Sequence, residues 1–156
     1  MPEDIGEVLP DDEAMFHHRL WMIDEFDGVI DGEKKFHKSL VEYREEAELD
    51  DSWPFVRASW GPMDPGFSSI LEAYDDLELV YKEKDGQIHI YKETEKGSKY
   101  IQGLINGLRI LKKDQTEARE KELRLVAKVN KDRLGSEIEK DELIQKLKEA
   151  PLGSEI

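Results

Sequence analysis

One stretch of the chain, residues 53–97, constrains the fold more than any other. Residues 61–66 read Gly-Pro-Met-Asp-Pro-Gly, a composition that predicts a turn. Asp64-Pro65 within it is typical of a helix start, because the acid can cap the helix and proline suits the first helical position. Apolar residues recur at helical spacing over 65–77, so a short amphipathic helix is predicted there.

A β-hairpin is predicted directly after this helix. Asp85-Gly86 lies between two extended segments, 79–84 and 87–91, and this dipeptide is a strong signal for a two-residue hairpin turn. Thr94 has a side chain suited to cap a following helix, whose apolar positions repeat every three or four residues up to Leu111. The predicted order along this stretch is therefore helix, two-stranded hairpin and helix.

Further helices are predicted on both sides of this stretch. Asp11 or Asp12 can cap a helix that runs to about Asp27, and Gly28 suits the left-handed position that ends a helix. The remaining predicted elements are a short extended piece at 29–30, a helix at 31–48, an extended segment at 55–60, and helices at 116–134 and 140–149.

Together these elements predict a mostly α fold with a small β wing (α+β), specifically a winged helix-turn-helix with additional C-terminal helices. We divide the chain into a flexible acidic arm at 1–11, a winged-helix domain at 12–113 and a C-terminal helical extension at 114–156.

Three motifs in this order resemble the SocA-type antitoxin (Panacea) domain and its archaeal and bacterial winged-helix relatives. The first is Lys-Lys-Phe-His-Lys-Ser-Leu-Val at 34–41, and the second is Trp-Gly-Pro-Met-Asp-Pro at 60–65. The third combines Leu-Glu-Leu-Val at 77–80 with Glu-Thr-Glu-Lys-Gly at 93–97. The match covers roughly residues 14–112, and it implies a helical winged fold with an antitoxin-like or transcriptional role.

The charge is strongly negative and unevenly distributed. The net charge is −14, and residues 1–50 carry 16 acidic and 5 basic side chains, whereas residues 101–156 carry 11 and 12. The acidic end should repel nucleic acid and anionic lipid. The absence of cysteine excludes disulfides and thiolate metal sites. No leader sequence or membrane-length apolar run is visible, so we expect a cytoplasmic protein with no membrane partner.

DNA binding is the first function to consider, because winged helices commonly contact DNA. The helix at 65–77 would enter the major groove, but its polar face carries Glu72, Asp75 and Asp76 and no lysine or arginine. The remaining mode is a DNA contact made mainly by the wing. The alternative is that the same cations are solvated surface residues. The candidate DNA-binding residues are Lys34, Lys35, Lys38, Lys82, Lys84, Lys92, Arg109, Lys112 and Lys113.

Protein interaction is the second function to consider. The helix at 116–134 has an apolar stripe that is a candidate homodimer interface, with packing inside the chain as the competing interpretation. The stripe comprises Leu123, Val126, Ala127 and Asn130, whereas Leu125 and Val129 lie off it.

A catalytic role is disfavoured by the motifs. His17 and His18 are adjacent and diverge on a helix, while His37 and His89 lie elsewhere, and no metalloprotease, phosphate-loop or nucleophile-elbow motif is present. We therefore expect no enzyme activity, no metal and no cofactor. The sequence favours a non-catalytic regulatory protein, a transcription-regulator-like dimer that touches DNA through the wing and adjacent lysines. The alternative is an antitoxin-like or adaptor protein whose acidic surface meets a basic partner protein.

Overall fold

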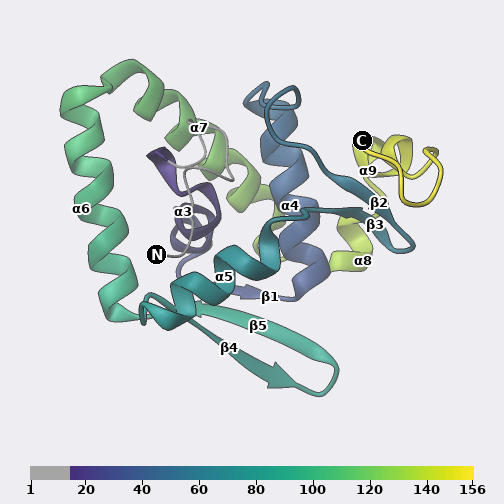
Figure 1. The fold of residues 1–156 in the computed structure, drawn as a ribbon, viewed down its shortest axis with the longest axis horizontal. Coiled ribbons are helices and arrows are strands. Elements are labelled where there is room, and N and C mark those ends of the chain that lie inside the picture. The colour runs from purple at the N-terminus through teal and green to yellow at the C-terminus, as the bar shows by residue number, and fades with distance from the viewer. Residues whose placement is uncertain (1–14) are drawn as a thin grey trace.

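The computed structural model describes residues 15–156, an α+β fold that combines helices with two small antiparallel sheets (Figure 1). The predicted acidic arm at 1–11 and the predicted start of the first helix lie outside the described residues. The elements are α3 (His18–Glu25), β1 (Val29–Asp31), α4 (Glu33–Glu46), β2 (Val56–Ala58), β3 (Gly61–Met63), α5 (Phe67–Asp76), β4 (Val80–Asp85), β5 (Ile88–Glu93), α6 (Glu95–Leu111), α7 (Lys113–Asn130), α8 (Gly135–Ile138) and α9 (Glu142–Leu147).

The predicted first helix is interrupted at His17. His17 takes a left-handed backbone conformation with φ of 49°, which interrupts the helix before α3. At the other end, Asp27 takes the left-handed cap position with φ of 59°, one residue before the predicted Gly28. Gly28 follows with φ of 87°, and its N–H donates to the Ile23 carbonyl at 2.9 Å.

The larger sheet has the strand order β1-β5-β4. Val29 pairs with Lys92 and Val80 pairs with Glu93, so the short strand after the first helix joins a hairpin that comes much later in the chain. Asp85 pairs with Ile88, which places the turn at Gly86 and Gln87, one residue later than predicted. The reason is that Gly86 carries the positive φ, 62°, at the first turn position.

The smaller sheet corrects the prediction of a turn at 61–66. Residues 61–63 form β3, which pairs with β2, and Pro62 lies opposite Arg57. Proline lacks an N–H donor but is tolerated in a short edge strand. The chain's last residues extend this sheet on the other side of β2, because Arg57 N donates to the Ser154 carbonyl and Ile156 N donates to the Phe55 carbonyl, both at 2.9 Å.

Helix α6 is tied closely to the hairpin. Thr94 Oγ1 accepts a hydrogen bond from Gly97 N at 2.9 Å, which is the predicted N-cap. Thr94 N in turn donates to the Leu79 carbonyl at 3.0 Å. These two contacts hold the start of α6 against the start of β4.

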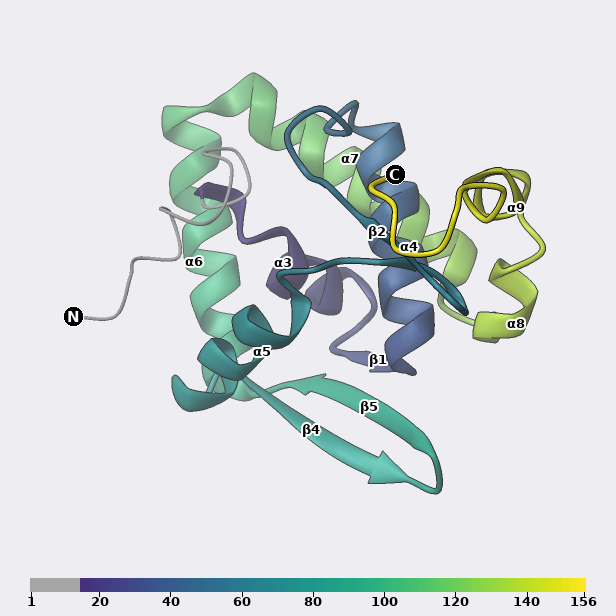
Figure 2. The same ribbon diagram turned by 45° about the vertical axis from the view of Figure 1, so that its right-hand side comes forward.

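The core lies where α3, α4 and α7 pack together (Figure 2). Trp21, Phe36 and Leu40 are fully buried there. The segment predicted as a C-terminal extension contributes to this core through Leu123 and Ile138. None of the described helices combines the length and the apolar composition that crossing a bilayer requires.

Candidate partner-binding cleft

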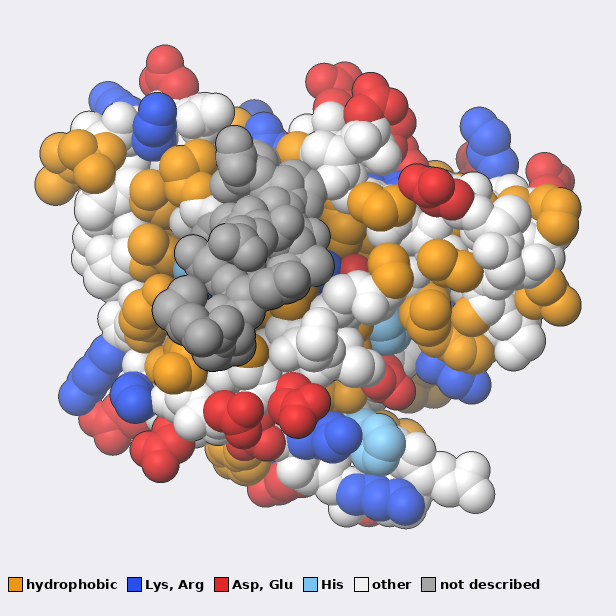
Figure 3. Space-filling view, in the orientation of Figure 1, with side chains coloured by type: hydrophobic (Ala, Val, Ile, Leu, Met, Phe, Trp, Pro, Cys, Tyr) orange, Lys and Arg blue, Asp and Glu red, His pale blue; other side chains and the backbone are white. Residues whose placement is uncertain are grey.

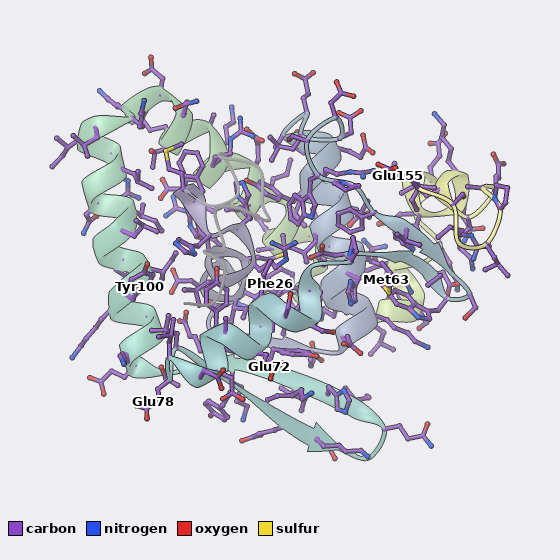
Figure 4. The ribbon with its side chains drawn as sticks, in the orientation of Figure 1. Phe26, Met63, Glu72, Glu78, Tyr100 and Glu155 are labelled. Carbon is purple, nitrogen blue, oxygen red and sulfur yellow. The ribbon has the colours of Figure 1, made fainter. Side chains whose placement is uncertain are left out.

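Helix α5 separates its apolar and acidic sides. Phe67, Ile70, Leu71 and Tyr74 are buried, at the spacing that the sequence predicted for the inner face. Glu72, Asp75 and Asp76 are exposed, with Glu72 lying between α5 and the hairpin (Figure 4). The helix that the sequence predicted would enter the major groove therefore carries carboxylates in solvent.

A cleft of about 240 Å³ lies between α5 and the β4–β5 hairpin. Its buried lining is apolar and aromatic, formed by Phe67, Leu71, Val80 and Tyr91. Its outer lining is polar, with three acids and one lysine, and is formed by Glu33, Ser68, Glu72, Asp75, Tyr81 and Lys82. An apolar floor with three carboxylates around it suits a ligand that is both apolar and cationic.

The floor of the cleft is rigidly packed. The ring of Tyr91 meets those of Phe36 and Phe67 edge to face, with centroids 5.5 and 5.4 Å away. The Tyr91 hydroxyl donates to Glu33 Oε1 at 3.3 Å. Burial, followed by the charge of Glu33, raises the pKa of Tyr91, so the phenol stays protonated and continues to donate. Tyr91 thus fixes the acid that begins α4 at the edge of the cleft.

The hairpin carries charges of both signs. Lys82 and Lys84 are exposed on β4, but Glu83 and Asp85 alternate with them. Lys92 Nζ on β5 forms an ion pair with Glu83 at 2.9 Å. Of the three predicted lysines of the wing, therefore, two project into solvent and one is neutralised by its neighbour across the hairpin.

Two predicted DNA-binding lysines are buried instead of exposed. Lys35 is 2% exposed, and its Nζ donates to Asp31 Oδ1 at 2.8 Å and to the Lys131 carbonyl at 2.9 Å. Lys38 is also 2% exposed, and its Nζ donates to the Gly135 carbonyl at 3.1 Å and pairs with Glu139 at 3.9 Å. The segment after α7 folds over α4 and covers both ammonium groups, so neither is available to DNA. Lys34, next to Lys35 in the sequence, is exposed.

The other predicted cations lie at a different end of the molecule. Arg109, Lys112 and Lys113 lie at the corner where α6 meets α7, while the hairpin adjoins the start of α6. A helix of this length spans about 25 Å. Figure 3 shows Lys and Arg side chains along the hairpin and again at the α6–α7 corner, with acidic side chains gathered near α5. Arg109 is also paired with Glu120. The candidate cations therefore do not form one continuous positive face.

The predicted dimer stripe packs against other elements of the same chain. Leu123, Val126, Ala127 and Asn130 are all buried against neighbouring elements, chiefly α3 and α4. Asn130 Nδ2 donates to Ser39 Oγ at 3.1 Å and to Glu42 Oε1 at 2.7 Å. The competing interpretation, packing within the chain, accounts for the burial of this stripe.

A buried polar network holds the start of α5, and the sequence pattern did not reveal it. Arg19 on α3 donates through Nε and Nη2 to the two carboxylate oxygens of Asp64 at 2.5 and 2.7 Å. Trp53 Nε1 donates to Asp64 Oδ1 at 3.2 Å. Asp64 N donates to His37 Nδ1 at 3.0 Å, and burial lowers the pKa of His37 to about 4, so this ring is a neutral acceptor. Of these residues, only Asp64 had a local sequence signal, namely its place at the predicted start of a helix.

The described residues contain no group of three or more His, Cys, Asp or Glu side chains arranged to hold a metal ion. Comparison with known protein families, curated proteins and solved structures finds no match for this chain. The chemistry of the cleft and of the surfaces around it is therefore the basis on which a function can be inferred.

Proposed function

We propose that this chain is a non-catalytic regulatory protein of the winged-helix class that acts by binding a basic partner protein at the cleft between α5 and the hairpin. The element order supports the class, because a helix, a strand, two helices and a hairpin follow one another. The strand order β1-β5-β4, with the early strand beside the second hairpin strand, supports it as well. The small β2–β3 sheet is inserted before α5.

The acidic surface of α5 is the observation that carries the functional part of the proposal. Glu72 and Asp75 border a cleft whose floor is apolar. Carboxylates at this place repel phosphates, and DNA binding draws most of its non-specific affinity from cations. The same carboxylates attract lysine and arginine. An apolar side chain that fills the floor adds favourable binding free energy because it is removed from water. This supports the adaptor or antitoxin-like alternative over the DNA-binding dimer.

The test uses a short peptide of alternating lysine and leucine, labelled with a fluorophore, as the probe. Wild-type protein should bind it with an affinity that falls with added salt, and Glu72→Lys/Asp75→Lys should abolish the binding. Glu117→Lys/Glu142→Lys is the matched control, because it makes the same change in net charge at exposed positions of α7 and α9. Equal loss in both variants would show only a general attraction to an acidic protein and would contradict the cleft.

DNA binding through the wing is the second candidate, and it is supported by the exposure of Lys82 and Lys84 on β4. Its test is anisotropy of a labelled random duplex at low salt, with Lys82→Glu/Lys84→Glu as the variant. We expect no binding by the wild type. A shift that the variant abolishes would replace the cleft proposal with a wing-led contact to DNA.

A further inference from the structure

Helix α7 presents a second apolar surface that the fold leaves uncovered. Leu125 is 48% exposed and Val129 is 53% exposed, and they lie one turn apart on the same side of the helix. Together with Val126 and Leu143 they line a groove of about 320 Å³ beside α4. The other lining residues are acidic, namely Glu42, Glu45 and Glu46.

The cations of residues 119–133 fall into two groups. Four of them form ion pairs within the chain, two with acids at or just after the end of α3 and two within the C-terminal segment itself. These four pairs are Arg119 with Glu122, Arg124 with Glu25, Lys131 with Asp27 and Arg133 with Asp141. Lys121 and Lys128 are exposed, and neither has an ion-pair partner among the described residues. They flank Leu125 at i−4 and i+3, so they project from the same side of the helix.

The acids of the groove lie beside this part of α7. Helices α4 and α7 run antiparallel, because Arg119 contacts the carbonyl of Ala47 at one end while Asn130 contacts Ser39 at the other. Glu46 is exposed and has no ion-pair partner among the described residues, whereas Glu45 pairs with Arg44 at 2.9 Å and remains about one third exposed. One face thus contains an apolar pair, a row of cations on α7 and a row of carboxylates on α4.

We propose that a second copy of this chain docks on this face, with its α7 lying parallel to the first α7 and related to it by a two-fold axis that runs along the helices near Leu125 and Val129. A two-fold interface requires a self-complementary surface, and this face has both signs of charge in separate rows on either side of its apolar centre. The rotation places Lys121 and Lys128 of each copy over the carboxylates of the other. This inference is independent of the α5 cleft, which lies on other elements.

The small apolar centre predicts a weak dimer, with a dissociation constant in roughly the micromolar range that rises with salt. Sedimentation velocity over a range of protein concentrations measures it. We expect Leu125→Glu/Val129→Glu to weaken the dimer at least about tenfold. The control is Ile110→Glu/Leu111→Glu, which alters two more exposed apolar residues at the α6–α7 corner and should leave association unchanged. Circular dichroism checks that each variant is folded.

A charge exchange tests the two-fold geometry itself. Lys121→Glu/Lys128→Glu and Glu45→Gln/Glu46→Lys should each prevent self-association, because like charges then face one another. A mixture of the two variants should form a heterodimer, since both sets of contacts become attractive in it. The glutamine at 45 keeps an acceptor for Arg44.

Three results would overturn the proposal: a wild type that stays monomeric at about 100 µM and low salt, a dimer that Leu125→Glu/Val129→Glu leaves intact, or charge variants that fail to pair when mixed. The Glu72→Lys/Asp75→Lys variant should dimerise like the wild type. A result that overturns the dimer proposal can therefore be told apart from one that overturns the cleft proposal.

Discussion

The carbonyl oxygen of Leu79 lies 2.0 Å from the position that a Cβ on Gly97 would occupy. The first turn of α6 therefore approaches the start of β4 so closely that only glycine fits. The N-cap at Thr94 and the hydrogen bond from Thr94 N to the same Leu79 carbonyl hold the two elements at this distance.

We predict that Gly97→Ala destabilises the fold. Forcing a methyl group onto a backbone atom costs about 1–3 kcal/mol or more, which exceeds the gain of about 1 kcal/mol in helix propensity. Urea denaturation of the two proteins measures the difference in the free energy of unfolding. Gly103→Ala is the control, because this glycine is exposed in the same helix and an added methyl group would meet no atom within 4 Å. There alanine should stabilise the protein by about 1 kcal/mol.

The buried carboxylate of Asp64 gives a second prediction. It accepts hydrogen bonds from Arg19 and Trp53, and Asp64→Ala leaves a buried guanidinium without this counter-charge. Breaking a buried ion pair from one side costs about 3–5 kcal/mol. Asp51→Ala removes an exposed acid and should change the free energy of unfolding by no more than about 0.5 kcal/mol. Equal effects of the two substitutions in thermal or urea unfolding would contradict the network.

The buried ring of His37 predicts a loss of stability in mild acid. Its pKa is lowered from 6.5 to about 4 by burial, so between these values the unfolded chain binds a proton that the folded chain does not. The contribution of His37 to the free energy of unfolding therefore decreases as the pH falls through this window, by about 3 kcal/mol in total. His37→Asn keeps an acceptor for Asp64 N but does not titrate, so the difference between the two pH profiles isolates the histidine. If the free energies of unfolding of the wild type and His37→Asn change in parallel from pH 4 to 7, the titration of His37 does not cause the loss of stability.

The carboxyl group of Glu93 predicts a dependence of the opposite sign. Burial, followed by a hydrogen bond with Asp24, raises its pKa from 4.5 to about 8, so the folded chain keeps a proton that the unfolded chain releases. The contribution of Glu93 is fully present below pH 4.5 and is lost as the pH rises through 8. Glu93→Gln should therefore have a higher urea midpoint than the wild type at pH 9. This advantage should shrink steadily toward pH 4.5.

An exposed carboxylate provides the comparison for that experiment. Glu117 lies in solvent on α7, and Glu117→Gln should shift the midpoint only slightly at either pH. If Glu93→Gln behaves in the same way, Glu93 is not held in its protonated form.

Local sequence signals determined several parts of this protein. Thr94 caps α6 as its side chain predicted, Gly28 takes a positive φ just after the end of α3, and the hairpin forms around Gly86. The acidic face of α5 also follows from the spacing of its residues alone. In each case the cause lies within a few residues along the chain, so the sequence by itself contains it.

Tertiary structure decided the rest, because burial depends on segments that are distant in the sequence. The spacing of α4 shows Lys35 and Lys38 as ordinary surface lysines, and only the backbone around Lys131 and Gly135, some 96 residues later, turns them into buried donors. The stripe on α7 has the spacing of an interface, and spacing is the same whether the covering helix belongs to this chain or to another. A periodic pattern specifies that a face must be buried, but only long-range packing specifies what buries it.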